Sequence, residues 1–181
     1  MIYCNKQNEK VCLPDILECE NKVDIQNYMD KLYKIFTDDY LISRPIFKGK
    51  KVFIRKEPRD GNKEHTFIHL THEDFFHKSG DPNDRVPDFR RSERLSWTRK
   101  IIENYKCSVD NECEKILYWE ELFRGYKRIN LLYKDERFLV VLEERDYCYL
   151  LITSFYLEKD YALDKRIKKY ELYEKQKTPL M

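Results

Sequence analysis

The sequence has little glycine and proline, with 4 Gly and 6 Pro among 181 residues. It also lacks low-complexity tracts and internal repeats, which argues against a disordered chain or a repeat architecture. Hydrophobic residues make up 41% of the chain and aromatic residues 14%, enough for a hydrophobic core. A chain of this length most naturally forms one domain. We expect residues 1–45 to form an N-terminal helical elaboration and residues 46–181 the core.

Long apolar runs are missing as well. No segment approaches the length of about 18 apolar residues that a membrane-spanning helix needs. The first residues, "MIYCNKQNEK", lack the basic and then apolar layout of a signal peptide. The sequence therefore predicts a cytoplasmic protein with no membrane partner. A P-loop, a nucleophile elbow and a dinucleotide fingerprint are also absent, which argues against the enzyme classes that require them.

The six cysteines show no spacing typical of a disulfide framework or a zinc site. No CxxC pair exists, so we expect reduced thiols and no structural metal. Cys148 lies inside a strand-like pattern and is interpreted as a small core residue.

Charge is unevenly distributed along the chain, although the net charge is only +2. Residues 1–45 carry six basic and eight acidic residues. Residues 85–106 carry seven basic and three acidic residues, and residues 159–177 carry seven and four. Two basic segments in a nearly neutral chain indicate a localised anion-binding site.

The first half of the chain predicts helices around short strands. Residues 24–36 have helical apolar spacing, with Asp24 as the N-cap. "KKVFIRKEP" is typical of a strand that ends before Pro58, and "EHTFIHLTHEDFF" of a second strand or a strand turning into a loop. "HKSGDPNDRVPDF" predicts a surface loop. A helix is expected at residues 91–105, with Ser92 as a possible cap.

The second half predicts four consecutive strands, "KILYWEEL", "KRINLLYK", "RFLVVLEER" and "YCYLLITSFYL". Hairpin-length connections join the last three strands, so the pattern indicates an antiparallel meander. The third strand is apolar on both faces, which is typical of a central strand covered on both sides. A helix at residues 160–175 follows. We therefore predict an α+β fold, with a meander sheet of four or more strands packed by N-terminal, middle and C-terminal helices.

Three segments together resemble the barnase–EndoU–colicin–RelE ribonuclease group, and in particular its phage- and toxin-associated members. They are "FIHLT" (67–71), "RRSERLSWTRKIIEN" (90–104) and "RFLVVLEERDYCYLLITSFYLEKDYALDKRIKKYE" (137–171). The resemblance covers about two-thirds of the chain and does not include residues 1–45. It implies a metal-independent endoribonuclease without a cofactor. Its expected partners are RNA, either tRNA or mRNA, and an antitoxin or immunity protein.

The same resemblance implies a catalytic set. His69 corresponds to the family's strand histidine and is expected to act as general acid or base. Arg91 and Arg94 are three residues apart, and we expect them to project from one side of a helix toward phosphate. Thr153 corresponds to a strand-end hydroxyl that donates a hydrogen bond to the scissile phosphate. Each residue also has a structural interpretation: a backbone-bonded histidine, a solvated helix face and a good strand former.

A second set is expected to bind the flanking phosphates. Thr153 and Ser154 must point to opposite faces of their strand, so at most one of them can belong to a given site. In the last helix we expect Leu163, Ile167 and Tyr170 to face inward, with the lysines on the outer or site-facing side. The flanking RNA-binding candidates are Arg90, Lys165, Arg166, Lys168 and Lys169.

Alternatives to this function remain open. His65, His69, His72 and His77 form a cluster that could hold a metal ion, and their spacing fits a helix better than a strand. A catalytically inactive RNA- or protein-binding module of the same fold would keep the basic surface without the chemistry. A phage accessory protein would use the basic segments for solvation alone.

Overall fold

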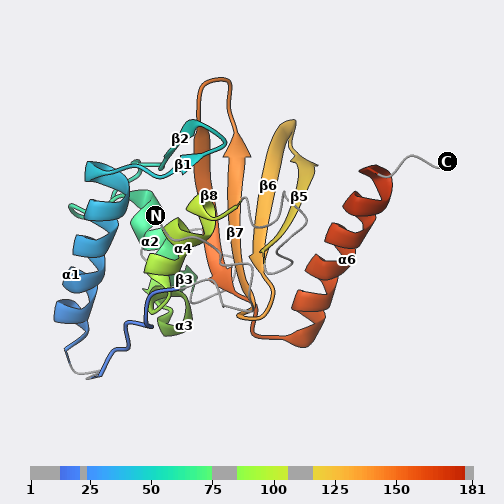
Figure 1. The fold of residues 1–181 in the computed structure, drawn as a ribbon. Helices are drawn as coiled ribbons and strands as arrows, with labels where there is room; N and C mark the ends of the chain where they lie inside the picture. Colours follow the sequence, from blue (N-terminus) through green and yellow to red (C-terminus); the bar gives the residue numbers. More distant parts are fainter. Residues whose placement is uncertain (1–12, 21–23, 75–84, 106–115, 178–181) are drawn as a thin grey trace.

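The computed structural model describes residues 13–20, 24–74, 85–105 and 116–177. Helices and strands alternate in the first half, whereas strands dominate the second (Figure 1). The helices are α1 (Ile25–Phe36), the π-helix η1 (Thr37–Ile42), α2 (His65–Thr71), α3 (Phe89–Ser92), α4 (Leu95–Glu103) and α6 (Asp160–Lys177). The strands are β1 (Ile46–Phe47), β2 (Lys50–Phe53), β3 (His72–Asp74), β4 (Arg85–Pro87), β5 (Ile116–Phe123), β6 (Tyr126–Tyr133), β7 (Phe138–Glu144) and β8 (Tyr149–Tyr156).

The main sheet has six strands in the order β1-β2-β8-β7-β6-β5. Strands β5 to β8 form an antiparallel meander, while β2 joins β8 in parallel. Strands β3 and β4 form a separate two-stranded sheet. The predicted α+β fold, with a meander sheet and helices from the N-terminal, middle and C-terminal parts of the chain, is confirmed.

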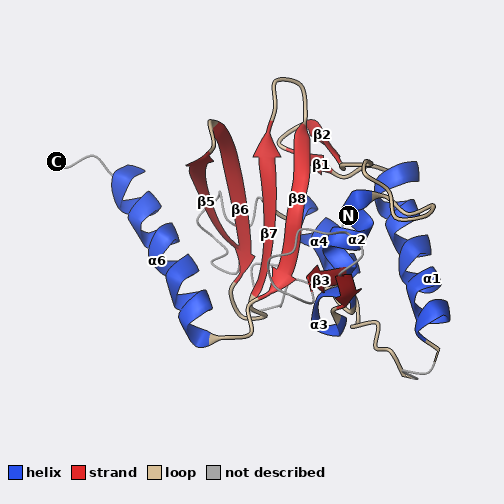
Figure 2. Cartoon of the chain, turned by 180° about the vertical axis from the view of Figure 1, so that it is seen from behind, coloured by secondary structure: helices blue, strands red, loops and turns tan. Residues whose placement is uncertain are grey.

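The two faces of the main sheet are covered by different helices. On one face, Val140 packs in a core with Leu32 of α1, Phe67 of α2 and Ile101 of α4; we call it the α4 face. On the other face, Val141 belongs to a cluster against which α6 packs; we call it the α6 face. In Figure 2, β7 and β8 lie in front of α4, so that view looks onto the α6 face. The expectation of a central strand covered on both sides is confirmed for β7.

Helix α1 begins as predicted. The Asp24 carboxylate accepts a hydrogen bond from the backbone N–H of Asn27, which satisfies one N–H group of the first turn. Leu32 and Phe36 are completely buried in the core of the α4 face. The helix therefore packs into the same core as the meander.

Residues 64–76 were predicted as a strand or a strand turning into a loop, and this prediction is wrong for residues 65–71, whereas His72–Asp74 do form a strand, β3. Residues 65–71 form α2, in which only His65 and His69 of the first five residues are half-buried and the others are buried. A short apolar run does not separate a buried strand from a buried helix by periodicity. The spacing of the two histidines, four residues apart, was the available helical signal.

The predicted middle helix is two helices. Asp88 caps α3, because its carboxylate accepts a hydrogen bond from the Arg91 N–H at 3.1 Å. Ser92, the expected cap, is buried inside α3, and its hydroxyl lies 3.1 Å from the Tyr28 hydroxyl. The chain then turns at Glu93 before α4 begins, so the helical phase is not continuous from Arg91 to Arg94. Helix α4 buries Leu95, Ile101 and Ile102 in the core of the α4 face.

Two further expectations concern Cys148 and the surface loop. Cys148 is half-buried and immediately precedes β8, so it is not a core residue. The surface loop was expected at residues 77–89, which is wrong for its last part, because Arg85–Pro87 form β4 and Phe89 begins α3. Residues 77–84 lie outside the described residues, as do Cys4, Cys12, Cys107 and Cys113. Among the helices of the described ranges, none is long and apolar enough to cross a membrane.

A buried hydroxyl pair joins α4 to β8 and gives a stability prediction. The Thr98 and Ser154 hydroxyl oxygens are 2.7 Å apart, and both residues are buried. We expect Ser154→Ala to lower the free energy of unfolding by about 1–3 kcal/mol, because the Thr98 hydroxyl then lacks its buried partner. Urea unfolding measures this change. The double variant Thr98→Val/Ser154→Ala should recover part of the loss, and a purely additive double variant would contradict the assignment.

Candidate active site

The candidate site lies where β8 extends beyond β2. The registered pairs of β2 with β8 are Val52 with Tyr149 and Phe53 with Leu150, at the beginning of β8. Farther along β8, helices α2 and α3 pack against the strand. The end of β8 that carries Thr153 therefore meets the helices that carry His69 and Arg91.

His69 belongs to the half-buried stripe of α2. Its ring stacks on that of His65, with the centroids 5.9 Å apart. Arg85 Nη1 of β4 lies 3.4 Å from His69 Nδ1. Because a guanidinium can only donate, Nδ1 is the acceptor in this contact, which puts the proton of the neutral ring on Nε2. A histidine beside an arginine in a partly exposed position suits proton transfer next to an anion.

Arg91 connects this histidine to the sheet. Its Nη1 donates hydrogen bonds to the backbone carbonyls of His69 at 2.9 Å and His72 at 3.3 Å, at the end of α2. Its guanidinium carbon also lies 5.8 Å from the ring centroid of Phe155 in β8. Phe155 is registered with Leu139 on the α6 face. Arg91 thus holds the last turn of α2 beside that face.

Arg94 points elsewhere. Its guanidinium carbon lies 4.9 Å from the ring of Tyr156 and 5.2 Å from that of Trp97. Tyr156 and Phe155 are consecutive strand residues and face opposite sides of the sheet. The expectation that Arg91 and Arg94 project from one side is therefore wrong, because the helix breaks between them.

Thr153 and Ser154 divide as their positions in the strand require. Ser154 is registered with Val140 on the α4 face, where it binds Thr98. Thr153 is registered with Val141 on the α6 face and is half-buried. Thr153 and Phe155 therefore share the face beside which Arg91 lies.

The basic residues of α6 do not act as one group. Residues Leu163, Ile167 and Tyr170 pack toward the sheet, as predicted. Lys165 and Lys168 are exposed and line a shallow hollow on the other side of the helix, together with Tyr161 and Leu172. Arg166 and Lys169 are half-buried, and Lys169 forms an ion pair with Glu121 of β5. Arg90, the remaining candidate, is largely exposed and pairs with Glu158.

The α6 face also carries polar residues that the sequence did not single out. Glu143 is only 3% exposed and pairs with Arg128, whose Nε donates to the carboxylate at 2.8 Å, and with Arg145. Asn130 and Trp119 are registered partners nearby, and within the described ranges the Asn130 Oδ1 and Trp119 Nε1 atoms are buried without a hydrogen-bond partner. Glu143 shares a face of its strand with Leu139 and Val141. An acidic residue on an otherwise apolar strand face was therefore the sequence signal for this buried polar group.

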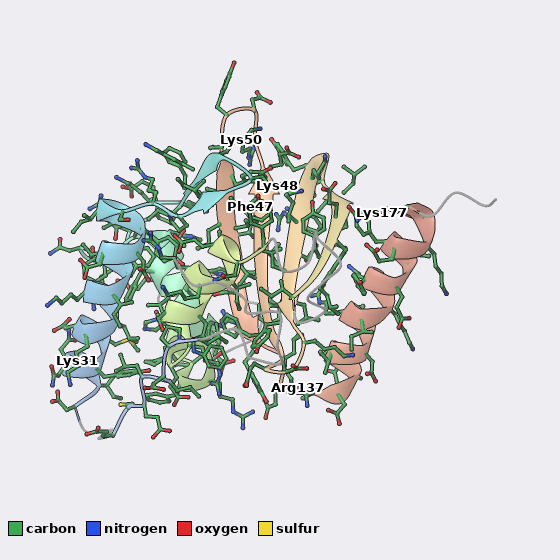
Figure 3. The ribbon with its side chains drawn as sticks, in the orientation of Figure 1. Lys31, Phe47, Lys48, Lys50, Arg137 and Lys177 are labelled. Atoms are coloured by element: carbon green, nitrogen blue, oxygen red, sulfur yellow. The ribbon has the colours of Figure 1, made fainter. Side chains whose placement is uncertain are left out.

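A separate group of charged side chains lies on the α4 face. Figure 3 shows Lys48 and Lys50 at the end of the sheet where the β1–β2 hairpin lies. Lys48 Nζ donates to the Tyr118 hydroxyl at 2.6 Å, and Tyr118 donates to Glu120. Burial lowers the pKa of Lys48 and raises that of Tyr118. These groups satisfy one another, so they brace the hairpin against the meander.

The histidine cluster does not assemble a metal site in the part of the chain that the structure describes. There, no three His, Cys, Asp or Glu side chains come close enough to hold a metal ion. His72 Nδ1 is 2.8 Å from the Thr71 hydroxyl, and His69 contacts Arg85. His77, the fourth member of the cluster, lies outside the described residues.

His72 gives a prediction about pH. Burial lowers its pKa from 6.5 to about 4. Between these values the unfolded chain binds a proton that the folded chain does not, so lowering the pH favours unfolding. We expect about 3 kcal/mol of stability, complete above the unfolded pKa, to be lost as the pH falls to about 4. Urea unfolding of the wild type and His72→Asn across this range measures the difference, and identical pH dependences would contradict it.

Comparison with known proteins identifies no relative of this chain. The chain matches no family model, no curated protein and no solved structure. The function of the chain must therefore be inferred from the residues around β8 and from their chemistry.

Proposed function

We propose that the protein is a metal-independent endoribonuclease that cleaves RNA through attack of the 2′-hydroxyl group. The observation that carries the proposal is the position of Arg91, which binds the His69 carbonyl on one side and lies over Phe155 on the other. It brings the turn of a half-buried histidine to the sheet face that presents the Thr153 hydroxyl. Histidine, arginine and hydroxyl are the group types that phosphate transesterification needs.

The proposed reaction balances without a co-reactant. The 2′-oxygen loses its proton and forms a bond to phosphorus, while the bond from phosphorus to the 5′-oxygen breaks and that oxygen takes up a proton. The products are a 2′,3′-cyclic phosphate and a 5′-hydroxyl. His69 transfers one of the protons as general acid or base. Arg91 stabilises the charge on the phosphorane, and Thr153 donates a hydrogen bond to a non-bridging oxygen.

The surroundings of the histidine support an anionic substrate. Arg85 lies beside His69 Nδ1, and the positive charges of Arg55 and Arg85 lower the pKa of His65, although burial is the larger cause. Arg91 is held by Asp88, which accepts from its backbone and faces its guanidinium at 3.4 Å. An arginine that is already oriented binds a phosphate oxygen with less loss of side-chain freedom.

Incubation of the purified protein with total RNA in EDTA tests the proposal. We expect fragments that end in a 2′,3′-cyclic phosphate, which end-specific enzymatic treatment of the products identifies. Salt-dependent RNA binding without any product would instead support a non-catalytic RNA-binding module. Cleavage that stops on chelation would contradict the metal-independent mechanism.

A further inference from the structure

The α6 face carries a second group of side chains, at the β5–β6 hairpin. Phe123 and Tyr126 face each other as the last registered pair of this hairpin and are 47% and 45% exposed. The guanidinium carbon of Arg128 lies 4.7 Å from the Phe123 ring centroid. That of Arg145 lies 3.9 Å from the Tyr126 ring centroid. We call these two arginine–aromatic stacks the hairpin platform.

A buried carboxylate holds the two arginines of the hairpin platform together. Arg128 donates to one oxygen of Glu143, and Arg145 pairs with the other. A guanidinium has five N–H donors, so a bond to Glu143 leaves others for a phosphate oxygen. The carboxylate thus orients two positive groups next to two exposed rings. Because a buried carboxylate fixes both arginines, the platform is a preorganised group of side chains and not a chance pairing of mobile surface side chains.

The hairpin platform and Thr153 lie on the same face of the sheet. Trp119 is registered with Asn130, Asn130 with Val141, and Val141 with Thr153, so these residues form one row across the sheet. Phe123 lies four residues beyond Trp119 along β5. At about 3.3 Å per residue, the platform is about 13 Å from the row that contains Thr153. A short single strand of nucleic acid can therefore contact both.

Similar stacks recur across this face. The Arg44 guanidinium carbon lies 4.6 Å from the ring of Phe53, which is registered with Leu150 on the α6 face. Arg91 over Phe155 is a further example at the other end of β8. Aromatic rings and guanidinium planes both offer flat surfaces on which unpaired bases stack. Bases inside a duplex are already stacked, so such a face favours a single strand.

We propose that the hairpin platform is a binding subsite for single-stranded RNA. Unpaired bases stack on Phe123 and Tyr126, while Arg128 and Arg145 bind the adjacent phosphates. The inference rests on the proposed function, because it extends the RNA from the cleavage site along the same face. It also restricts the substrate class to RNA that is unpaired beside the scissile bond.

Binding measurements in a cleavage-deficient background test this subsite. A short fluorescein-labelled single-stranded RNA is titrated with the His69→Ala protein, and anisotropy gives the dissociation constant. We expect Phe123→Leu and Tyr126→Leu each to weaken binding roughly 5- to 100-fold. The control is Leu122→Ala, which shortens an exposed side chain on the opposite face of β5 from Phe123 and should bind as before. A duplex of the same sequence should bind more weakly than the single strand.

A second variant separates phosphate binding from stacking. Arg145→Gln keeps a polar side chain but removes the positive charge and with it one phosphate contact, so the slope of the logarithm of affinity against the logarithm of salt should fall by about one. This readout does not depend on the ring substitutions. An unchanged slope would exclude a phosphate contact for Arg145.

The outcomes distinguish failure of the subsite from failure of the proposed function. Equal affinities for Tyr126→Leu and Leu122→Ala, equal affinities for duplex and single strand, or no RNA binding by the protein would each overturn the subsite. Wild-type cleavage together with any of these results would leave the proposed function standing. Binding that depends on Tyr126, without wild-type cleavage, would support the subsite and contradict the endoribonuclease.

Discussion

Replacing His69 with alanine is expected to lower the rate of RNA cleavage by about 100- to 10,000-fold. The proposal assigns His69 a proton transfer, and its half-buried position on α2 beside Arg85 leaves water a poor substitute. Single-turnover cleavage of a labelled RNA, with protein in excess, measures the chemical step directly. The affinity for the same RNA should change far less than the rate, because the proposed contacts of Arg91 and of the hairpin platform remain.

His65 provides the matched control for this variant. It lies one turn earlier on α2, is half-buried like His69, and stacks on it. His65→Ala should therefore cause a similar loss of packing without removing the proton-transfer group. If both variants lower the rate equally, the effect is structural and His69 is not the acid or base. If His69→Ala cleaves as fast as the wild type, the catalytic assignment is wrong.

Replacing Arg91 with lysine is expected to lower the cleavage rate by roughly 100- to 1,000-fold, the usual cost of one lost donor to a developing anion. Lysine keeps the charge, but Nη1 of Arg91 already contacts both the His69 and the His72 carbonyls, and an ammonium group in its place lacks the second terminal nitrogen of the guanidinium. The phosphorane then loses an oriented donor, and the turn that carries His69 loses its link to Phe155. The measurement is the single-turnover rate per folded molecule.

Arg94→Lys tests whether the face of the sheet matters. The side chains of Arg94 and Arg91 are similarly accessible, at 16% and 18%, but Arg94 stacks on Tyr156, which faces away from Thr153. We expect Arg94→Lys to affect stability and to leave the cleavage rate nearly unchanged. If Arg94→Lys lowers the cleavage rate as much as Arg91→Lys does, the assignment of the active site to the α6 face is wrong.

The meander was predictable because four apolar, strand-like runs follow one another with hairpin-length connections between the last three, and strand geometry also placed Thr153 and Ser154 on opposite faces. A strand places consecutive side chains on opposite faces whatever its surroundings. The opposite positions of Ser154, which contacts Thr98, and of Thr153 follow from this rule. The strand-end position expected for Thr153 is wrong, because β8 continues to Tyr156.

The errors came from segments whose local pattern is ambiguous. Residues 65–71 are buried nearly all round, so their apolar run gave no clear period, and packing against β8 decided for a helix. Ser92, at the break between α3 and α4, contacts the hydroxyl of Tyr28, which is 64 residues away in sequence, and no local rule reports such a contact. The ion pairs of Glu143 required the register of β6 with β7.

Cleavage through attack of the 2′-hydroxyl group is tested most directly with one RNA in two forms. After the cleavage position in a short single-stranded RNA is mapped, the same RNA is made with a 2′-deoxy nucleotide at that position, and both are incubated with the protein in EDTA. We expect cleavage of the all-ribose strand to a 2′,3′-cyclic phosphate and no cleavage at the substituted position of the other strand. Both RNAs should still bind to the protein. Cleavage at the 2′-deoxy position would contradict the mechanism, because the proposed nucleophile is then missing.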